Sequence, residues 1–445
     1  MKKDKETTGE KKIVILGAGL TGLTAAHFLE NPVSGRAKTK PFLLEKKDCA
    51  GGLCRTEQKN GFCFDYTGHL LHFKNRDSTW KSFVENTLKI NLQRHSRRAS
   101  IHIMNTLVPY PFQYHLSYLS KKEKDRCVKD YLKIYKNAER PGGSRESFGS
   151  WAENSFGKRM ASLFFIPYNK KLWNFDLGKM STAWMGRFVP GPDVKKILRG
   201  AEKKDTSRSA GYNASFYYPR RGGIGQLPQA LEKGKNIIFN AAVRQIDFVK
   251  KKIFFEGGVM AYDKLISTIP LPELLNYLKG SPVKNLAKKL KWTGVYNMNI
   301  AVKKDFSKLG HWIYFPHGKV PFYRLGFLSN FSAVPGGFST IYIESSYRAE
   351  RKKLSAAAVM KFLNISRSDI AVTKTLDIPY AYVIYDMNRE KYLARIRDFF
   401  ASRDIISTGR FGGWKYSTME EAMQDGFDAA KEIMSGTVSI SRRLF

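Results

Sequence analysis

Three glycines near the N-terminus have a spacing that suits phosphate binding. Gly17, Gly19 and Gly22 form a GxGxxG pattern, with Leu20 and Thr21 between the second and third glycines. In such a pattern the first glycine allows a tight turn, the second lets the backbone approach a pyrophosphate, and the third lets a helix pack closely on a strand. The N-terminus of that helix offers free N–H groups and a partial positive charge to the phosphates.

The segments around these glycines have the pattern of a β-α-β unit. Residues 13–16 (IVIL) predict a buried strand, residues 22–30 predict a helix, and residues 41–45 (PFLLE) predict a second strand. Glu45 ends that strand, where its carboxylate can accept hydrogen bonds from two ribose hydroxyls. Strand, glycines, helix, strand and acid in this order predict a dinucleotide site, and a glycine-rich turn without a ligand is the less favoured alternative.

The composition is that of a folded, strongly basic protein. Of the 445 residues, 42% are hydrophobic and 13% aromatic, which excludes a disordered chain, and 76 Lys plus Arg against 39 Asp plus Glu give a net charge of +37. The basic residues are spread along the chain, so a lysine-rich solvated surface is the favoured interpretation. No sequence signature predicts a specific nucleic-acid partner, whereas the charge allows peripheral association with a membrane surface.

The cysteines and the apolar runs of the sequence indicate in which cellular compartment the protein is expected. The four cysteines are Cys49, Cys54, Cys63 and Cys127. None has CxxC spacing, so we predict no metal site, although His69 and His72 lie nearby in the sequence. Unpaired thiols suit a reducing cytosol, and we predict a cytoplasmic protein. No apolar run is long enough for a transmembrane segment.

The rest of the chain alternates between helical and strand-rich stretches. We expect residues 77–135 to be mostly helical, with further helices around 147–166. Strands are expected over 215–270 and 293–346, and a last strand at 404–409 leads into a helix from about residue 418.

This order predicts an α/β fold with a Rossmann-type dinucleotide-binding domain, an inserted helical domain and a mixed β-sheet domain. The resemblance described next implies that the first is an FAD-binding domain and that the other two bind substrate. The expected boundaries are 1–78 with 214–272 and 386–445 for the discontinuous FAD-binding domain, 79–213 for the helical substrate domain, and 273–385 for the β-rich substrate domain.

The segment from Glu45 to Arg55 resembles the E-x5-GG-x-x-R signature of the FAD-dependent amine oxidase superfamily. The resemblance implies FAD as cofactor, and it implies that the GRFGG segment from Gly409 aims a helix N-terminus at the flavin. The expected cofactor-binding residues are Gly17, Gly19, Leu20, Thr21, Gly22, Glu45, Gly51, Gly52, Leu53, Arg55, Val243, Gly409, Met419 and Glu420.

Within this superfamily the chain is similar to the UDP-galactopyranose mutases, closer to the eukaryotic type, from residue 13 to about residue 430. The motifs that carry the similarity are FDYTGHLLHF, VPYPFQ, FFIPYNKKLW, YNASFYYPRRGGIG, WIYFPHGKVPFYRLGF, IPYAYVIYD and GRFGGWKY. The similarity implies a substrate site formed by Tyr110, Gln113, Phe164, Asn169, Trp173, Asn213, Tyr314, Tyr382 and Tyr416, with catalytic roles for His69, Arg324 and Arg410. It also places the glycines after Arg221 in a turn close to the flavin.

The resemblance implies a redox-neutral reaction that interconverts the pyranose and furanose forms of a UDP-sugar through a reduced-flavin N5 adduct. NAD(P)H would act as the external reductant. The residue types agree with this expectation, because Arg324 and Arg410 can bind one diphosphate in bidentate fashion and tyrosine hydroxyls can donate to phosphate without adding charge.

Two positions depart from the mutase pattern. Phe188 stands where the mutases have an arginine, and Phe331 stands where an aromatic hydroxyl is expected. These departures leave open which sugar nucleotide is bound. The alternative function is an FAD-dependent oxidoreductase of the amine oxidase or protoporphyrinogen oxidase type, and the sequence leaves the oligomeric state open.

Overall fold

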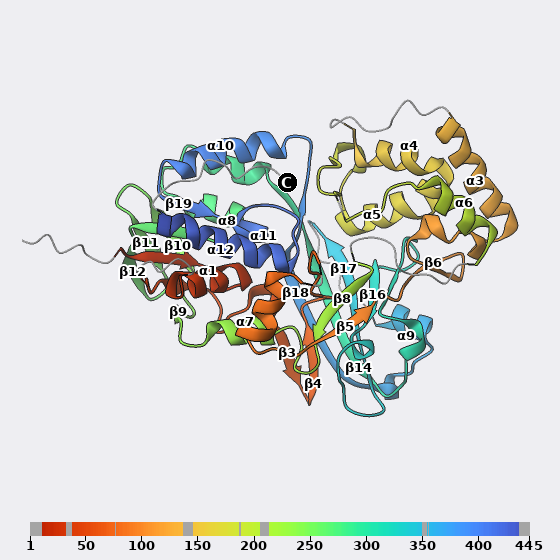
Figure 1. Ribbon diagram of the computed structural model, residues 1–445, viewed down its shortest axis with the longest axis horizontal. Coiled ribbons are helices and arrows are strands. Elements are labelled where there is room, and N and C mark those ends of the chain that lie inside the picture. Colours follow the sequence, from red (N-terminus) through yellow and green to blue (C-terminus); the bar gives the residue numbers. More distant parts are fainter. Residues whose placement is uncertain are drawn as a thin grey trace, which may run out of the picture. The chain divides into compact units, whose positions relative to one another are not determined.

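The computed structural model describes residues 11–32, 38–75, 77–136, 146–186, 188–204, 213–348, 354 and 356–435 of the chain (Figure 1). The chain forms two compact units, each assembled from separate stretches of the sequence. Unit 1 comprises Met1–Cys54, Leu227–Leu290 and Glu390–Phe445, and unit 2 comprises Arg55–Gln226 and Lys291–Arg389.

Unit 1 is built on a five-stranded parallel sheet with the order β19-β13-β1-β2-β9. Its strands are β1 (Ile13–Leu16), β2 (Phe42–Leu44), β9 (Asn236–Ile238), β13 (Lys264–Ser267) and β19 (Ile405–Ser407). The β1 strand is buried along its whole length, as its apolar sequence predicts for a parallel sheet covered on both faces. The predicted Rossmann-type arrangement is therefore present.

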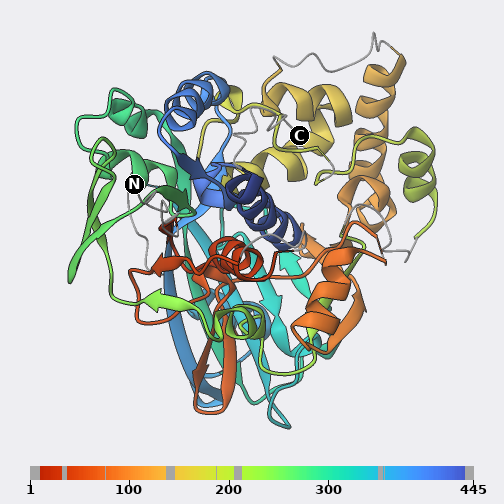
Figure 2. The same ribbon diagram turned by 60° about the vertical axis from the view of Figure 1, so that its left-hand side comes forward.

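The helices of unit 1 include α1 (Leu20–Glu30) and α12 (Met419–Ser435), which lie side by side although almost 400 residues separate them in the sequence (Figures 1 and 2). They approach closely at Gly426, where a Cβ atom would lie 2.4 Å from the carbonyl oxygen of Thr21. The unit also contains α8 (Leu271–Tyr277), α10 (Arg389–Ala401), the short α11 (Gly409–Gly412), and an antiparallel sheet of β10 (Val243–Asp247), β11 (Lys252–Phe255) and β12 (Gly258–Ala261). The α7 helix (Gln226–Glu232) belongs to unit 1 except for its first residue, Gln226, which is counted with unit 2.

Unit 2 is built on a seven-stranded mixed sheet with the order β18-β14-β17-β16-β15-β6-β7. Its strands are β6 (Ala99–Ile103), β7 (Thr106–Pro109), β14 (Lys291–Val302), β15 (Trp312–Tyr314), β16 (Arg324–Phe327), β17 (Ser339–Tyr347) and β18 (Ile370–Ile384). Neighbouring strands run antiparallel except β15 and β6, which are parallel. Two antiparallel strand pairs accompany the sheet. One is the hairpin of β3 (Thr56–Lys59) and β4 (Phe62–Asp65), and the other joins β5 (Leu92–Ser96) to the distant β8 (Ser215–Pro219).

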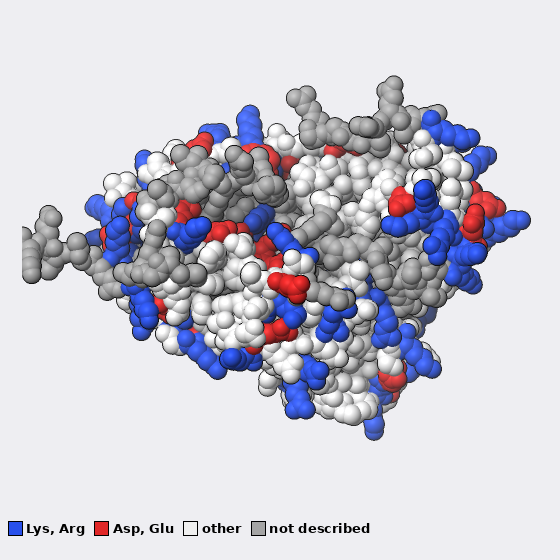
Figure 3. All heavy atoms as spheres, viewed as in Figure 1, with Lys and Arg blue, Asp and Glu red and all other residues white. Residues whose placement is uncertain are grey.

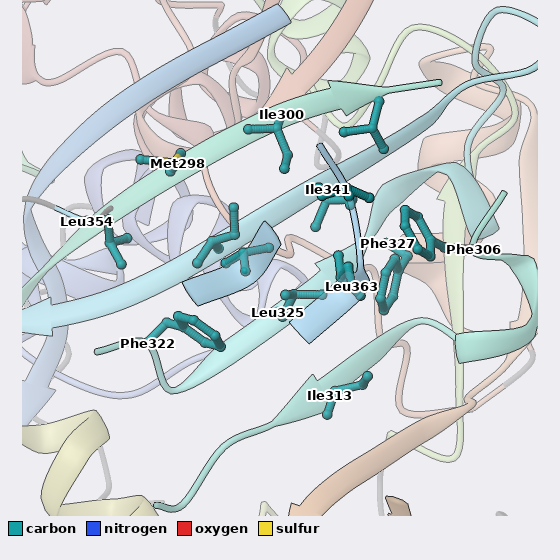
Figure 4. Packing of buried hydrophobic residues seen from close by; sticks show 14 of the residues in the cluster. Met298, Ile300, Phe306, Ile313, Phe322, Leu325, Phe327, Ile341, Leu354 and Leu363 are labelled. Atoms are coloured by element: carbon teal, nitrogen blue, oxygen red, sulfur yellow. The ribbon is translucent and has the colours of Figure 1, made fainter. Parts of the chain in front are cut away.

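The two faces of this sheet differ because successive residues of a strand point to opposite sides. One face carries Ile300, Ile343 and Leu325, which form a core with Val359 and Leu363 of α9 (Ala357–Leu363) (Figure 4). Burying each of these side chains contributes about 1.5–3 kcal/mol to stability. The opposite face carries polar residues of the same strands and is called the polar face below.

The remaining helices of unit 2 are α2 (Thr79–Ser82), α3 (Lys121–Lys136), α4 (Phe148–Met160), α5 (Ile166–Trp173) and α6 (Val194–Glu202). The prediction that residues 77–135 are mostly helical is wrong for residues 92–109, which form β5, β6 and β7. Ala99, Ile101 and Ile103 are buried, and β6 is held by pairing with β15, which is about 200 residues away. Such distant pairing overrides local helical tendency.

The unit boundaries also differ from the expected domains, because residues 55–78, 214–226 and 386–389 belong to unit 2 and residues 273–290 belong to unit 1. In the first of these stretches, Phe62 and Phe64 of β4 pack with Ala301 of β14 and Val372 of β18. None of the helices in the described stretches is both long and apolar enough to cross a membrane. All four cysteines lie within the described residues, and no disulfide joins any of them.

Candidate functional site

The turn between β1 and α1 is shaped by its glycines. Gly17 has a φ of +93°, which favours glycine, and a Cβ at Gly22 would lie 2.1 Å from the Gly17 carbonyl oxygen. Gly19 differs, because a Cβ there would meet only the Gly52 Cα, at 3.9 Å. Gly17 and Gly22 are therefore required by the turn itself, whereas Gly19 leaves open space beside the backbone at the first turn of α1.

Glu45 connects this turn to the next loop. Its buried carboxylate accepts hydrogen bonds from the Ala18 N–H at 2.8 Å and from the Lys47 N–H at 3.0 Å. The second glycine loop lies against the first, since the Gly51 N–H donates to the Ala18 carbonyl at 2.8 Å and Gly52 has a φ of +56°. Glu45 thus fixes the shape of the turn in addition to its predicted contact with a ribose.

The C-terminal segment of unit 1 contacts the same helix. A Cβ at Gly409, which has a φ of +80°, would lie 2.7 Å from the Thr21 hydroxyl. Arg410 lies over the Tyr416 ring at 4.7 Å and donates to the Ser417 carbonyl at 2.8 Å. Thr418 then caps α12 in a box with Glu421, as predicted, and the first residues of α12, Met419 and Glu420, are buried.

These features fit a dinucleotide such as FAD. The N-cap of α1 is Gly19, no side chain caps the helix, and open space lies beside it, so the first N–H groups remain available to a pyrophosphate. The expected cofactor residues of unit 1 lie in three segments, namely the turn and first residues of α1, the stretch that follows β2, and the starts of α11 and α12. The exception is Val243, which begins β10. Arg55 belongs to unit 2 and donates a 2.5 Å hydrogen bond to the Tyr66 hydroxyl.

In unit 2, four residues form a row across the polar face of the sheet. Tyr314 of β15 pairs with Arg324 of β16, Arg324 pairs with Glu344 of β17, and Glu344 pairs with Asn297 of β14. Residues paired directly across strands project to the same face. We call these four residues the polar row.

Arg324 and Glu344 form a bidentate ion pair at the centre of the polar row. Nε and Nη2 of Arg324 each donate to a Glu344 carboxylate oxygen at 2.8 Å, and the Glu344 side chain is fully buried. Burial lowers the pKa of Arg324, but the carboxylate more than offsets it and holds that pKa well above its ordinary value. Nη1 has no acceptor within hydrogen-bond distance among the described residues, so this edge of the guanidinium can bind a further anion.

The loop that carries His69 packs on the same face. The Asn297 amide donates to the Asp65 carbonyl at 3.3 Å, and a Cβ at Gly68 would lie 2.5 Å from the Tyr342 hydroxyl. The Gly68 N–H points at Glu344, with a long 3.4 Å contact. Glu344 therefore touches both the Arg324 side chain and the backbone beside His69.

Aromatic residues surround the outer end of the polar row. The Tyr314 ring lies 5.5 Å from Tyr110 and 5.2 Å from Tyr168, and Tyr168 stacks on Phe164 at 5.4 Å. Burial raises the pKa of Tyr168 well above its usual value, so this hydroxyl remains protonated. A second contact joins Trp173 of α5 to Tyr382 of β18 at 5.7 Å.

Three predicted polar substrate residues already have protein partners. Asn169 donates to the Phe165 carbonyl at 2.8 Å and accepts from Trp173 Nε1 at 3.0 Å, while Gln113 donates to the Pro190 carbonyl at 3.0 Å. Asn213 accepts from the buried Arg97, whose guanidinium also lies 4.7 Å from the Tyr110 ring centre. Arg97 therefore connects two predicted substrate residues.

A buried network supports the turn at Gly222–Gly225, which the resemblance places close to the flavin. The Asp65 carboxylate accepts from the hydroxyls of Thr56 and Tyr218, both at 2.6 Å, and Thr56 accepts from the Gly225 N–H at 2.8 Å. A Cβ at Gly223 would lie 2.3 Å from the Thr56 hydroxyl, so the turn closes directly onto this network. Burial raises the pKa of Asp65 to about 6, although these hydrogen bonds oppose the shift.

The family model for "Flavin containing amine oxidoreductase" matches residues 20–434. The chain belongs to the flavin-containing amine oxidoreductase family. Membership agrees with the glycine turn, the buried Glu45 and the open N-terminus of α1, and it implies a flavin cofactor.

Solved structures within this family's fold are similar along nearly the whole chain. A reduced UDP-galactopyranose mutase is 28% identical, with 96% of each chain covered and a TM-score of 0.86. A protein from Exiguobacterium sp. 255-15 named as a protoporphyrinogen oxidase is 15% identical, covers 96% of this chain and 99% of its own, and has a TM-score of 0.72. Cyclohexylamine oxidase from Brevibacterium oxydans is 14% identical, covers 96% of this chain and 99% of its own, and has a TM-score of 0.65. The last two likenesses show the fold alone.

In this chain the predicted site residues are divided between the two units. Arg410 and Tyr416 belong to unit 1, whereas His69, Arg324 and the other substrate residues belong to unit 2. Within unit 2, the contacts described above connect most of the predicted catalytic and substrate residues to one another or to their neighbours. The convergence of Arg324 and Arg410 on one diphosphate stays a prediction.

Four residues of this region are absent from the predicted set. They are Arg97, Tyr168, Tyr342 and Glu344. The sequence holds a signal for the last two, because STIYIES alternates polar and isoleucine residues. In that pattern Thr340, Tyr342 and Glu344 share one face of a strand, and a charged residue inside a buried strand needs a partner.

Proposed function

We propose that this protein is an FAD-dependent isomerase of the UDP-galactopyranose mutase type, which interconverts the pyranose and furanose forms of a UDP-sugar. The observation that carries the proposal is the polar row, in which Glu344 orients Arg324 and leaves Nη1 available beside Tyr314. A positioned guanidinium flanked by tyrosines suits a diphosphate, whereas an apolar amine or a porphyrinogen requires no such cation. The 28% identity to a reduced UDP-galactopyranose mutase over 96% of the chain adds support.

In this proposal the residues of the chain bind and orient the substrate. Arg324, together with Arg410, stabilises the negative charge of the departing UDP, and Tyr314, Tyr382 and Tyr416 donate hydrogen bonds to its phosphates. Tyr110 and Phe164 offer flat ring faces to the uracil base. His69 influences the flavin or the conformation of the loop beside it. Reduced FAD, when bound, supplies a nucleophile for the sugar carbon and is unchanged after each turnover.

The test of this proposal is conversion of UDP-galactofuranose to UDP-galactopyranose by the protein after reduction with dithionite under anaerobic conditions. We expect conversion with the reduced protein and little with the oxidised protein. If the reduced protein releases no UDP-galactopyranose, the proposal fails for this substrate. Release of hydrogen peroxide with an amine, or flavin reduction by a porphyrinogen, would favour the oxidoreductase alternative.

Binding of UDP separates substrate recognition from turnover. We expect Arg324→Ala and Arg410→Ala each to weaken UDP binding to the reduced protein by roughly tenfold or more, because each removes a charge-assisted hydrogen bond worth about 1.5–3 kcal/mol. Isothermal titration calorimetry measures this. Unchanged affinity in either variant would remove that arginine from the site.

A further inference from the structure

Two helices of unit 2 expose a cluster of basic residues. The outer side of α3 exposes Lys122, Arg126, Lys129, Lys133 and Lys136, which recur every three or four residues and so lie on one face of the helix. The opposite side of α3 is buried through Cys127 and Tyr131. Asp125 is the one exposed acid within α3.

The α6 helix continues this surface. It packs against α3. It also lies close to the backbone at Tyr114, since a Cβ at Gly200 would lie 2.0 Å from the Tyr114 carbonyl oxygen. Its exposed cations, with those directly after it, are Lys195, Lys196, Arg199, Lys203 and Lys204. Figure 3 shows Lys and Arg side chains gathered over α3 and α6, with fewer Asp and Glu among them. We call the exposed cations of α3 and α6 together the basic face.

Few of these charges are neutralised within the protein. In this region Arg126 pairs with Glu123 at 3.2 Å and Lys196 with Asp193 at 3.1 Å. Lys122, Lys129 and Lys133 have no carboxylate within 4.0 Å among the described residues. Like charges held this close repel one another, and an anionic partner relieves the repulsion.

We propose that the basic face docks the protein onto an anionic lipid surface. Along α3 the stripe from Lys122 to Lys136 spans about 21 Å at 1.5 Å per residue, so its cations can meet many headgroups at once. Attraction to anionic headgroups needs only a cluster of basic side chains near the surface. Tyr135, which is 54% exposed at the end of the stripe, has the amphipathic ring that favours a membrane interface.

The same observations favour lipid over nucleic acid. Eight of the ten cations named for the basic face are lysines, which act as point charges, whereas recognition of bases relies largely on bidentate arginine. The rings of Tyr114 and Tyr118, which could stack on bases, are covered by Lys196 and Lys204 at 5.8 and 5.7 Å.

The test is co-sedimentation of the full-length FAD-loaded protein with phosphatidylcholine vesicles that contain about 30% phosphatidylserine. We expect binding at low salt that is lost at about 0.5 M salt, because screening shortens the reach of the charges. The variant K122E/K129E/K133E should bind about tenfold more weakly or worse. Thermal unfolding confirms that the variant is folded, and a folded variant with unchanged binding would overturn the proposal.

The matched control is K233E/K284E/K289E, which changes the net charge equally at exposed lysines of unit 1. We expect it to retain most of the binding. An equal loss in both variants would show a response to net charge alone and would overturn the proposal. Equal binding to pure phosphatidylcholine, or tighter binding to duplex DNA, would do the same. Binding to vesicles requires no UDP-sugar, so the result is independent of the proposed isomerase activity.

Discussion

The turn from Gly17 to Gly22 is made of backbone, whereas the polar row is made of side chains that project from separate strands. In the turn, a single added carbon at Gly22 would meet the carbonyl oxygen of Gly17 at 2.1 Å. In the polar row, Arg324 depends on a carboxylate 20 residues further along the chain. A site formed by the backbone is therefore determined by the spacing of residues close together in the sequence. A site formed by side chains on separate strands is determined by the register in which those strands pair.

The largest effect is expected in the turn. Gly22→Ala should abolish FAD binding and lower the free energy of unfolding by about 4 kcal/mol or more, because the new Cβ overlaps the Gly17 carbonyl oxygen. Bound FAD, measured by absorbance after gel filtration, and thermal unfolding report the two effects.

Gly19→Ala is the matched control, since its Cβ meets only Gly52 at 3.9 Å. It should fold normally yet bind FAD more weakly. Normal FAD binding by Gly19→Ala would contradict the view that the pyrophosphate approaches the backbone at this position.

The next effect is expected in the polar row. Glu344→Ala should lower the free energy of unfolding by about 3–5 kcal/mol, because it leaves the largely buried Arg324 without its carboxylate. Urea unfolding measures the change. The double variant Glu344→Ala with Arg324→Met removes the orphaned charge and should recover part of the loss. A double variant that is less stable than either single variant would show that the ion pair does not act as a unit.

A pH-dependent effect is expected at Asp65, which supports the Gly222–Gly225 turn through Thr56. Its pKa of about 6 in the folded protein exceeds the ordinary value of 3.8, so the folded state binds the proton more tightly than the unfolded chain. This contribution to stability is complete below pH 3.8 and is lost as the pH rises to about 6, by about 3 kcal/mol at most. The stability of Asp65→Asn relative to the natural protein should therefore rise between pH 4 and pH 6 and then level off. Urea unfolding at several pH values tests this, and a constant difference would contradict the assignment.

The smallest effect is expected at Thr56. Thr56→Val removes the hydroxyl that accepts from the Gly225 N–H and should cost about 1–3 kcal/mol of stability, together with weaker FAD binding. Thr56→Ser keeps the hydroxyl and should behave nearly as the natural protein does. FAD titration followed by fluorescence compares the two, and equal affinities would show that the Gly222–Gly225 turn does not contact the flavin.

The parallel sheet of unit 1 and its glycine turn were predictable from the sequence, because each depends on residues that are close together in the chain. The apolar run at 13–16, the glycine spacing and the acid at Glu45 each constrain neighbouring residues, and the structure has them as expected. The capping box of Thr418 and Glu421 was predictable for the same reason.

The polar row could not be derived in the same way. Tyr314, Arg324 and Glu344 meet only because β15, β16 and β17 pair in one register, which no local spacing reveals. Resemblance to known mutases supplied Tyr314 and Arg324, but it did not supply Glu344. Likewise, residues 92–109 were expected to be helical because the partner of β6 lies about 200 residues away.

The register that builds the polar row also limits how this chain can change over evolutionary time. A one-residue insertion within β16 or β17 would turn Arg324 or Glu344 toward the core of Ile343 and Leu325, and would send isoleucine or leucine to the polar face. An insertion of two residues would keep the faces but displace the pairing by one step. We therefore expect length variation among relatives to fall in the loops between these strands, where an insertion leaves the two faces of the sheet unchanged.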